Sequence, residues 1–200
     1  MSKVCEYYFA PQSPWSYFGH ARLIELAKRY EVQIDMKPID LSQLYNAAGG
    51  LPLAKRPPQR QAYRLVELRR WSEHLGVPLN PQPKFPPLSG DAAAKLIIAA
   101  KLTHGTDAAL ALTGQIMQAF WTADRNIMDS ATLIALANEV GYDGAALSKA
   151  SETAAVQKTY EQFTSEAIAA NVFGVPWYVV DGEPFWGQDR LEFVEAAFKK

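Results

Sequence analysis

Segments with strand character occur only at the two ends of the chain, separated by roughly a hundred residues of almost purely helical pattern. The opening is expected to form a strand at 3–9, a helix at 14–30 and a second strand at 32–39. Ser13 is a favourable N-cap for this helix, and Pro14 takes the first helical position, where proline is best tolerated. This β-α-β opening favours a parallel sheet.

Strands return near the end, where 175–180 and 183–186 flank Asp181-Gly182, a favourable two-residue hairpin turn. A final helix is expected at 190–198. A loop rich in glycine and proline is expected at 46–60, with helices at 61–75, 91–104, 107–121, 130–140 and 145–170.

This order predicts an α/β, thioredoxin-like fold interrupted by an all-helical subdomain. Residues 1–45 and 165–200 would form the thioredoxin-like domain, and 46–164 the loop plus helical insertion.

Composition narrows the possible functions. The net charge is −1, with 20% charged residues and no block of like charge, so nucleic-acid binding is not expected. The N-terminal residues lack a signal-peptide pattern and no apolar run is long enough to span a bilayer, which favours a soluble, cytoplasmic protein without a membrane partner. The single cysteine, Cys5, excludes a dithiol redox cycle within the chain and is expected to be a buried structural residue.

The first candidate constellation is Ser13-Pro14-Trp15-Ser16 at the start of a helix. A helix N-terminus presents unpaired N–H groups and partial positive charge, and a serine hydroxyl there can donate to an anion such as a thiolate. Alternatively, Ser13 only caps the helix.

Two further constellations lie near the C-terminus. Pro176, if cis, would turn the backbone groups of Val175 outward to pair with an extended peptide, and otherwise only starts a strand. Gln188 and Asp189 precede the last helix. The backbone N–H groups at this helix start could bind a ligand carboxylate, and the Asp189 side chain could pair with a ligand ammonium group. Alternatively, Asp189 only caps the helix.

A basic stretch follows the mid-chain loop, and most of it is expected to be a solvated helix face. Arg60 is its preferred candidate for anchoring a ligand carboxylate. The three histidines have no ligand-like spacing, so a metal site is not expected. The basic stretch comprises Lys55, Arg56, Arg60, Arg64, Arg69 and Arg70.

The chain resembles the 2-hydroxychromene-2-carboxylate isomerase family, which belongs with kappa-class glutathione transferases in the DsbA-like thioredoxin superfamily. The resemblance runs essentially end to end and rests on YYFAPQSPWSYFGHARL, GGLPLAKRPPQRQAYRLVELRRW and FGVPWYVVDGEPFWGQDRLEF in this order.

The resemblance implies glutathione as cofactor and a homodimer. It assigns Ser13 to the glutathione sulfur, Val175 before Pro176 to the cysteinyl backbone, Gln188 and Asp189 to the γ-glutamyl head, and Arg60 to a carboxylate. Gln188 stands where the family has Asn or Ser, and the loop AAGGLPLAKRP lacks the family's Asn. These departures predict altered glutathione affinity or substrate choice.

The implied reaction interconverts an aromatic 2-hydroxychromene-2-carboxylate and a trans-o-hydroxybenzylidenepyruvate through reversible thiolate addition, as a step of aromatic catabolism. Trp15, Tyr17 and Trp177 are expected near the small aromatic carboxylate substrate or in the core. Two alternatives stay open: a kappa-like transferase or peroxidase acting on other electrophiles, and a non-catalytic thioredoxin-like binding protein.

Overall fold

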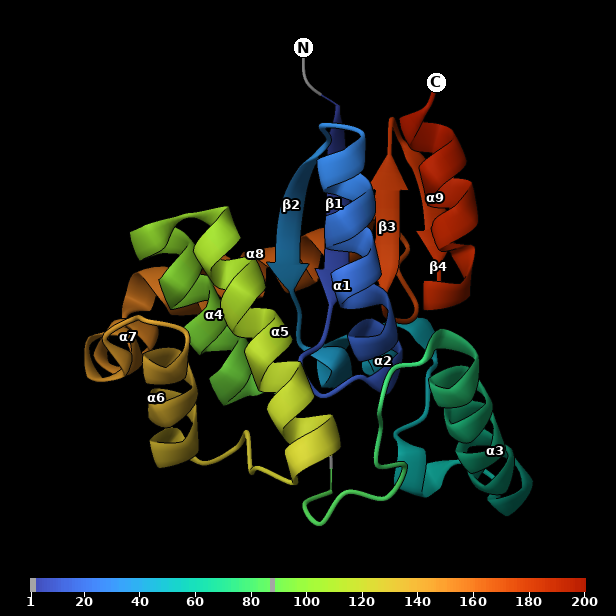
Figure 1. Ribbon diagram of the computed structural model, residues 1–200, viewed down its shortest axis with the longest axis horizontal. Helices are drawn as coiled ribbons and strands as arrows, with labels where there is room; N and C mark the ends of the chain where they lie inside the picture. The colour runs from blue at the N-terminus through green and yellow to red at the C-terminus, as the bar shows by residue number, and fades with distance from the viewer. Residues whose placement is uncertain (1–2, 87–88) are drawn as a thin grey trace.

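A mixed four-stranded sheet lies at the centre of the molecule (Figure 1), whose computed structural model describes residues 3–86 and 89–200. The strand order is β2 (Gln33–Pro38), β1 (Val4–Phe9), β3 (Trp177–Val180), β4 (Glu183–Trp186). β1 and β2 are parallel, as the β-α-β opening predicts, while β3 runs antiparallel to both β1 and β4. The sheet therefore joins the two ends of the chain.

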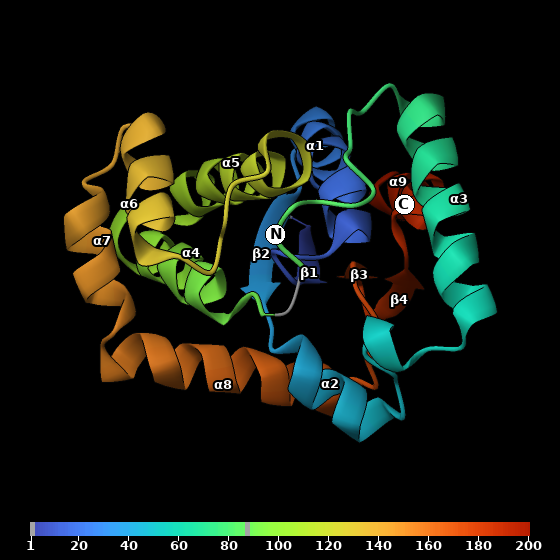
Figure 2. The ribbon, with the colours of Figure 1, turned by 90° about the horizontal axis from the view of Figure 1, so that it is seen from below.

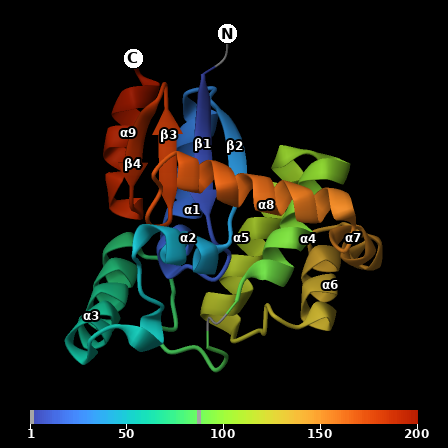
Figure 3. The same ribbon diagram turned by 180° about the vertical axis from the view of Figure 1, so that it is seen from behind.

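Helices cover both faces of the sheet. α1 (Pro14–Arg29) and α9 (Leu191–Phe198) lie on one face and contact each other, and α8 (Ala154–Ala169) crosses the other face (Figures 2 and 3). This arrangement is the expected thioredoxin-like core, and it places the N-terminus of α1 near the segment that precedes β3.

The helical insertion forms a second body of packed helices beside the sheet (Figure 1). Its apolar side chains join those of the sheet in one continuous buried cluster, so the two parts share a core. The insertion contains α4 (Asp91–His104), α5 (Thr106–Ala123), α6 (Ser130–Glu139) and α7 (Gly144–Ser151).

The expected element boundaries differ most from the structure at three places, while the strand expected at 175–180 begins only at Trp177. Part of the loop expected at 46–60 is helical, because α2 (Leu41–Ala48) is capped by Asp40 and is followed by a short 3₁₀ turn, Leu53–Lys55. The helix expected from residue 61 already begins at Pro58, as α3 (Pro58–Leu75), since proline fits the first helical turn.

The helix expected at 145–170 is two helices, α7 and α8. They separate at Thr153, whose hydroxyl accepts a hydrogen bond from the N–H of Val156 at 3.5 Å and so caps α8. Within the described parts of the chain, no helix is both long and apolar enough to cross a bilayer.

A charged cluster lies between β1, β2 and α8. The ammonium of Lys37 is nearly buried and lies 2.6 Å from the Glu6 carboxylate and 3.0 Å from that of Glu166. Burial opposes the charge on Lys37, but hydrogen bonds to these carboxylates outweigh it and raise its pKa. The cluster therefore ties α8 to the sheet through compensated charges.

Candidate active site

Ser13 occupies the N-cap of α1, as predicted, with Pro14 as the first helical residue. Its side-chain oxygen accepts a hydrogen bond from the N–H of Ser16 at 3.2 Å, and the residue is only 5% exposed. No acceptor among the described residues takes the hydroxyl hydrogen of Ser13. The hydroxyl can therefore cap the helix and still donate a hydrogen bond to an atom of a bound ligand.

The segment before β3 lies beside this helix start. The peptide bond between Val175 and Pro176 is cis, which agrees with the arrangement considered for a peptide-binding strand. The carbonyl of Pro176 accepts from the N–H of Gly187 at 2.9 Å, which ties this segment to the turn before α9. Among residues 3–86 and 89–200, no hydrogen bond uses the backbone N–H or C=O of Val175.

Gln188 and Asp189 lie in that turn, in the short 3₁₀ segment η2 (Gln188–Arg190). The Asp189 carboxylate lies 2.8 Å from the guanidinium of Arg190. The Gln188 side chain is 2% exposed, and its oxygen accepts from Arg22 of α1 at 2.7 Å. The side chain of Gln188 is therefore directed toward α1, which leaves its backbone N–H as the group available to a ligand.

Two hollows meet around the Ser13 segment. The first hollow has a volume of about 590 Å³ and lies between α3 and the η2 turn. The second hollow has a volume of about 480 Å³ and includes Ser13. Both are in the size range of ligand sites, roughly 300–1,000 Å³. The residues that line both hollows are Trp15, Arg56, Arg64 and Val175.

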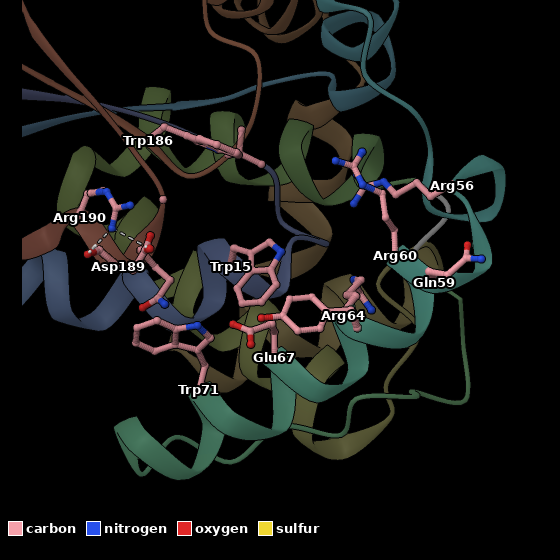
Figure 4. A pocket seen from close by; sticks show the side chains of 14 residues that line it. Trp15, Arg56, Gln59, Arg60, Arg64, Glu67, Trp71, Trp186, Asp189 and Arg190 are labelled. Atoms are coloured by element: carbon pink, nitrogen blue, oxygen red, sulfur yellow. Dashed lines mark hydrogen bonds and ion pairs between the residues drawn. The ribbon is translucent and has the colours of Figure 1, made fainter.

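The first hollow has a distinct group of charged residues at each end. Figure 4 shows Asp189 and Arg190 at one end, Arg56 and Arg60 at the other, and Trp15 between them. Trp71 and Trp186 supply further aromatic walls. This arrangement suits an extended ligand that carries an amino-acid head at one end and a carboxylate at the other.

The second hollow combines polar and apolar lining. Tyr45 of α2 lies in its wall, and its hydroxyl accepts from the Arg56 guanidinium at 3.3 Å. Burial and the neighbouring charge of Arg56 lower the pKa of Arg64, which makes no ion pair with a described residue. The two guanidiniums therefore leave uncompensated positive charge where the hollows meet.

The structure brings together Ser13, Val175, Gln188, Asp189 and Arg60 around the two hollows. Pro176 precedes β3 next to Val175 and is absent from both linings.

Sequence reasoning missed Trp71 and Trp186, and preferred Arg60 over its neighbours Arg56 and Arg64. The spacing of Arg60 and Arg64 by four residues, which places both on one face of α3, was the available signal.

The three aromatic residues expected near the site differ in their positions. Trp15 lines both hollows. Tyr17 instead donates its hydroxyl hydrogen to the carbonyl of Pro78 at 2.9 Å. Trp177 is 6% exposed and packs edge-on against Phe173, outside the lining of either hollow, because β3 turns its side chain into the sheet core.

Comparison with known proteins decides the family. The model of the DSBA-like thioredoxin domain matches residues 4–199. A 2-hydroxychromene-2-carboxylate isomerase from Sphingobium xenophagum is 32% identical over 197 residues, 98% of each chain. The chain belongs to the 2-hydroxychromene-2-carboxylate isomerase family, within the DSBA-like thioredoxin group. The predicted fold and the assignment to an isomerase-like enzyme family are thereby confirmed.

Structural comparison agrees with this family assignment. A solved 2-hydroxychromene-2-carboxylate isomerase superimposes with a TM-score of 0.82 at 27% identity, over 98% of this chain and 94% of the other. Glutathione s-transferase kappa 2 from Caenorhabditis elegans is 24% identical to this chain, and the match covers 98% of this chain and 94% of the relative. This kappa-class relative thus matches the chain over nearly its full length.

Proposed function

We propose that this member of the 2-hydroxychromene-2-carboxylate isomerase family is a glutathione-dependent isomerase. Its substrates would be an aromatic 2-hydroxychromene-2-carboxylate and the corresponding trans-o-hydroxybenzylidenepyruvate. The observation that carries the proposal is the free hydroxyl donor of Ser13, held at the N-terminus of the 16-residue helix α1 and beside Val175.

The described residues fit glutathione in three respects. The backbone groups of Val175 have no described partner, so they can pair with the cysteinyl unit. Asp189 and the N–H groups of the η2 turn suit the γ-glutamyl head. Arg60 lies at the opposite end of the first hollow, where it suits the glycine carboxylate (Figure 4).

Ser13 and α1 would favour the ionised form of a thiol bound there. The start of α1 supplies partial positive charge, and the Ser13 hydroxyl supplies a hydrogen bond to sulfur. A cysteine-type thiol titrates near 8.5, and each unit of lowering corresponds to about 1.4 kcal/mol. The ring C–O bond of the hydroxychromene would break, with the hydroxyl proton passing to the ring oxygen, to give the open-chain cis isomer. Bound glutathione would supply a thiolate that forms a C–S bond to its conjugated carbon, while the electron pair of the double bond moves to the carbonyl oxygen as an enolate. Rotation about the resulting single bond and loss of the thiolate would restore the double bond in the trans form.

The second hollow is suited to the aromatic substrate. Ser13 lies in its wall, so a substrate held there would be next to the sulfur. Trp15 and Tyr45 offer aromatic faces for stacking, while Arg56 offers a guanidinium for the substrate carboxylate. We place the reaction in the cytoplasm, where glutathione keeps thiols reduced, and expect a homodimer as the family resemblance implies.

Turnover distinguishes this function from its alternatives. The purified protein is expected to convert 2-hydroxychromene-2-carboxylate only when glutathione is present, and not to consume glutathione. The conversion is measured by the change in ultraviolet absorbance. A kappa-like transferase or peroxidase would instead consume glutathione with a generic electrophile such as an activated aryl halide, or with a peroxide. Glutathione binding without turnover of any of these compounds would favour a non-catalytic binding protein and contradict the proposal.

A further inference from the structure

Arg22 connects the helix that carries Ser13 to the turn that carries Asp189. Its guanidinium nitrogen Nη1 donates to the side-chain oxygen of Gln188 at 2.7 Å and to the backbone oxygen of the same residue at 3.2 Å. Gln188 is 2% exposed, so this contact is shielded from water and stronger than a surface hydrogen bond. Arg22 therefore holds the first residue of η2 at both its backbone and its side chain.

Gly19 lies on the same face of α1, three residues before Arg22, and allows the close approach. A Cβ atom at Gly19 would lie 3.2 Å from the Cβ of Gln188 and 2.6 Å from the hydroxyl of Tyr178. Because Gly19 has no side chain, the η2 turn can lie directly against α1, and the guanidinium of Arg22 holds it there.

The contact with the Gln188 carbonyl also affects the next N–H group. A trans peptide is planar with its C=O and N–H pointing in opposite directions, so a carbonyl directed at α1 turns the N–H of Asp189 away from α1. A cation on the carbonyl polarises the peptide and strengthens that N–H as a donor. No hydrogen bond among the described residues uses the N–H of Asp189.

Arg22 makes no ion pair with any described residue, unlike Arg29 of the same helix, which pairs with Glu25 at 2.8 Å. The hydrogen bonds of its guanidinium to described residues go only to the two neutral oxygens of Gln188. The positive charge thus remains available to favour an anion at the η2 turn.

We propose that Arg22 is a positioning residue for the amino-acid head of glutathione, acting through Gln188 on the N–H of Asp189. This inference rests on the proposed function, because it concerns the same ligand. It also accounts for a glutamine at position 188: the longer side chain reaches Arg22 instead of the ligand, and the backbone of the turn becomes the contact surface.

The test is glutathione binding by calorimetry to the Arg22→Met variant. We expect the dissociation constant to rise about tenfold, while the pKa of the bound thiol at saturating glutathione stays as in the wild type, because Ser13 and the start of α1 are intact. Arg22→Lys keeps a charge and is expected to recover part of the affinity. Arg29→Met, on the same helix, is the matched control and is expected to bind as the wild type does.

A double variant checks that Arg22 acts through Gln188. Gln188→Leu combined with Arg22→Met is expected to bind no more weakly than Arg22→Met alone, because both changes disrupt one contact. Unchanged affinity in Arg22→Met and Arg22→Lys would overturn the inference while leaving the proposed function in place. A loss of affinity accompanied by a changed thiol pKa would also overturn it, since it would indicate general damage. Absence of binding by the wild type would instead contradict the proposed function itself.

Discussion

Replacement of Ser13 by alanine is expected to lower kcat/KM about 100-fold, with little change in the affinity for glutathione. Removing one preoriented donor from a charge that develops during a reaction costs about 100- to 1,000-fold in other enzymes. The contacts proposed at Val175, at the η2 turn and at Arg60 do not involve the hydroxyl, so binding is expected to be retained. Steady-state kinetics with glutathione varied would measure both effects.

The same substitution also removes the cap of α1, so a control is needed. Loss of a hydroxyl cap costs about 1 kcal/mol of stability. Thr153→Ala removes a comparable cap from α8, and Thr153 is absent from the lining of both hollows. It should lower stability to a similar degree and leave kcat/KM unchanged. If Ser13→Ala were as active as Thr153→Ala, Ser13 would be a cap alone.

The stability of the folded chain is expected to fall by about 2 kcal/mol between pH 7 and pH 5 because of His20. Its ring is buried, with Nδ1 3.4 Å from the Tyr7 hydroxyl and Nε2 3.0 Å from the Leu110 carbonyl. Burial lowers the pKa of His20 to about 4, although the Leu110 contact opposes the shift.

Stability falls with decreasing pH because the unfolded chain takes up a proton on His20 before the folded chain does. The unfolded chain gains a proton on this histidine near pH 6.5, while the folded chain gains it only near pH 4. Acidification between these values therefore favours the unfolded state. Urea unfolding across this range should show the loss in the wild type and in the His104→Gln control, where the exposed ring stacks on Tyr142. A His20→Gln variant with the same pH dependence as the wild type would contradict this account.

Local patterns were sufficient to predict most of the fold. The cap at Ser13, the proline at the first helical position and the Asp181-Gly182 turn each act between near neighbours, and all agree with the structure. The errors arose where a cap was overlooked. Asp40 starts a helix before the glycine-rich loop, and Thr153 divides a long apolar pattern into two helices.

The site was less predictable because its contacts join distant segments. Gln188 and Arg22 are far apart in the chain, and no local pattern shows that the amide of one faces the guanidinium of the other. Trp177 lies next to Pro176, yet the pleat of β3 directs its ring away from the hollows. The sequence motifs indicated which turns line the two hollows, but not which side chains of those turns face into them.

The most direct test is the pKa of glutathione's thiol in the presence of the protein, measured by calorimetric binding and the ultraviolet absorbance of the thiolate. The account predicts binding at millimolar glutathione or below, with the thiol pKa at least one unit under its value in free solution. The shift should be reduced in Ser13→Ala. Absence of binding at millimolar concentration, or a bound thiol that titrates as it does in free solution, would contradict the thiolate mechanism.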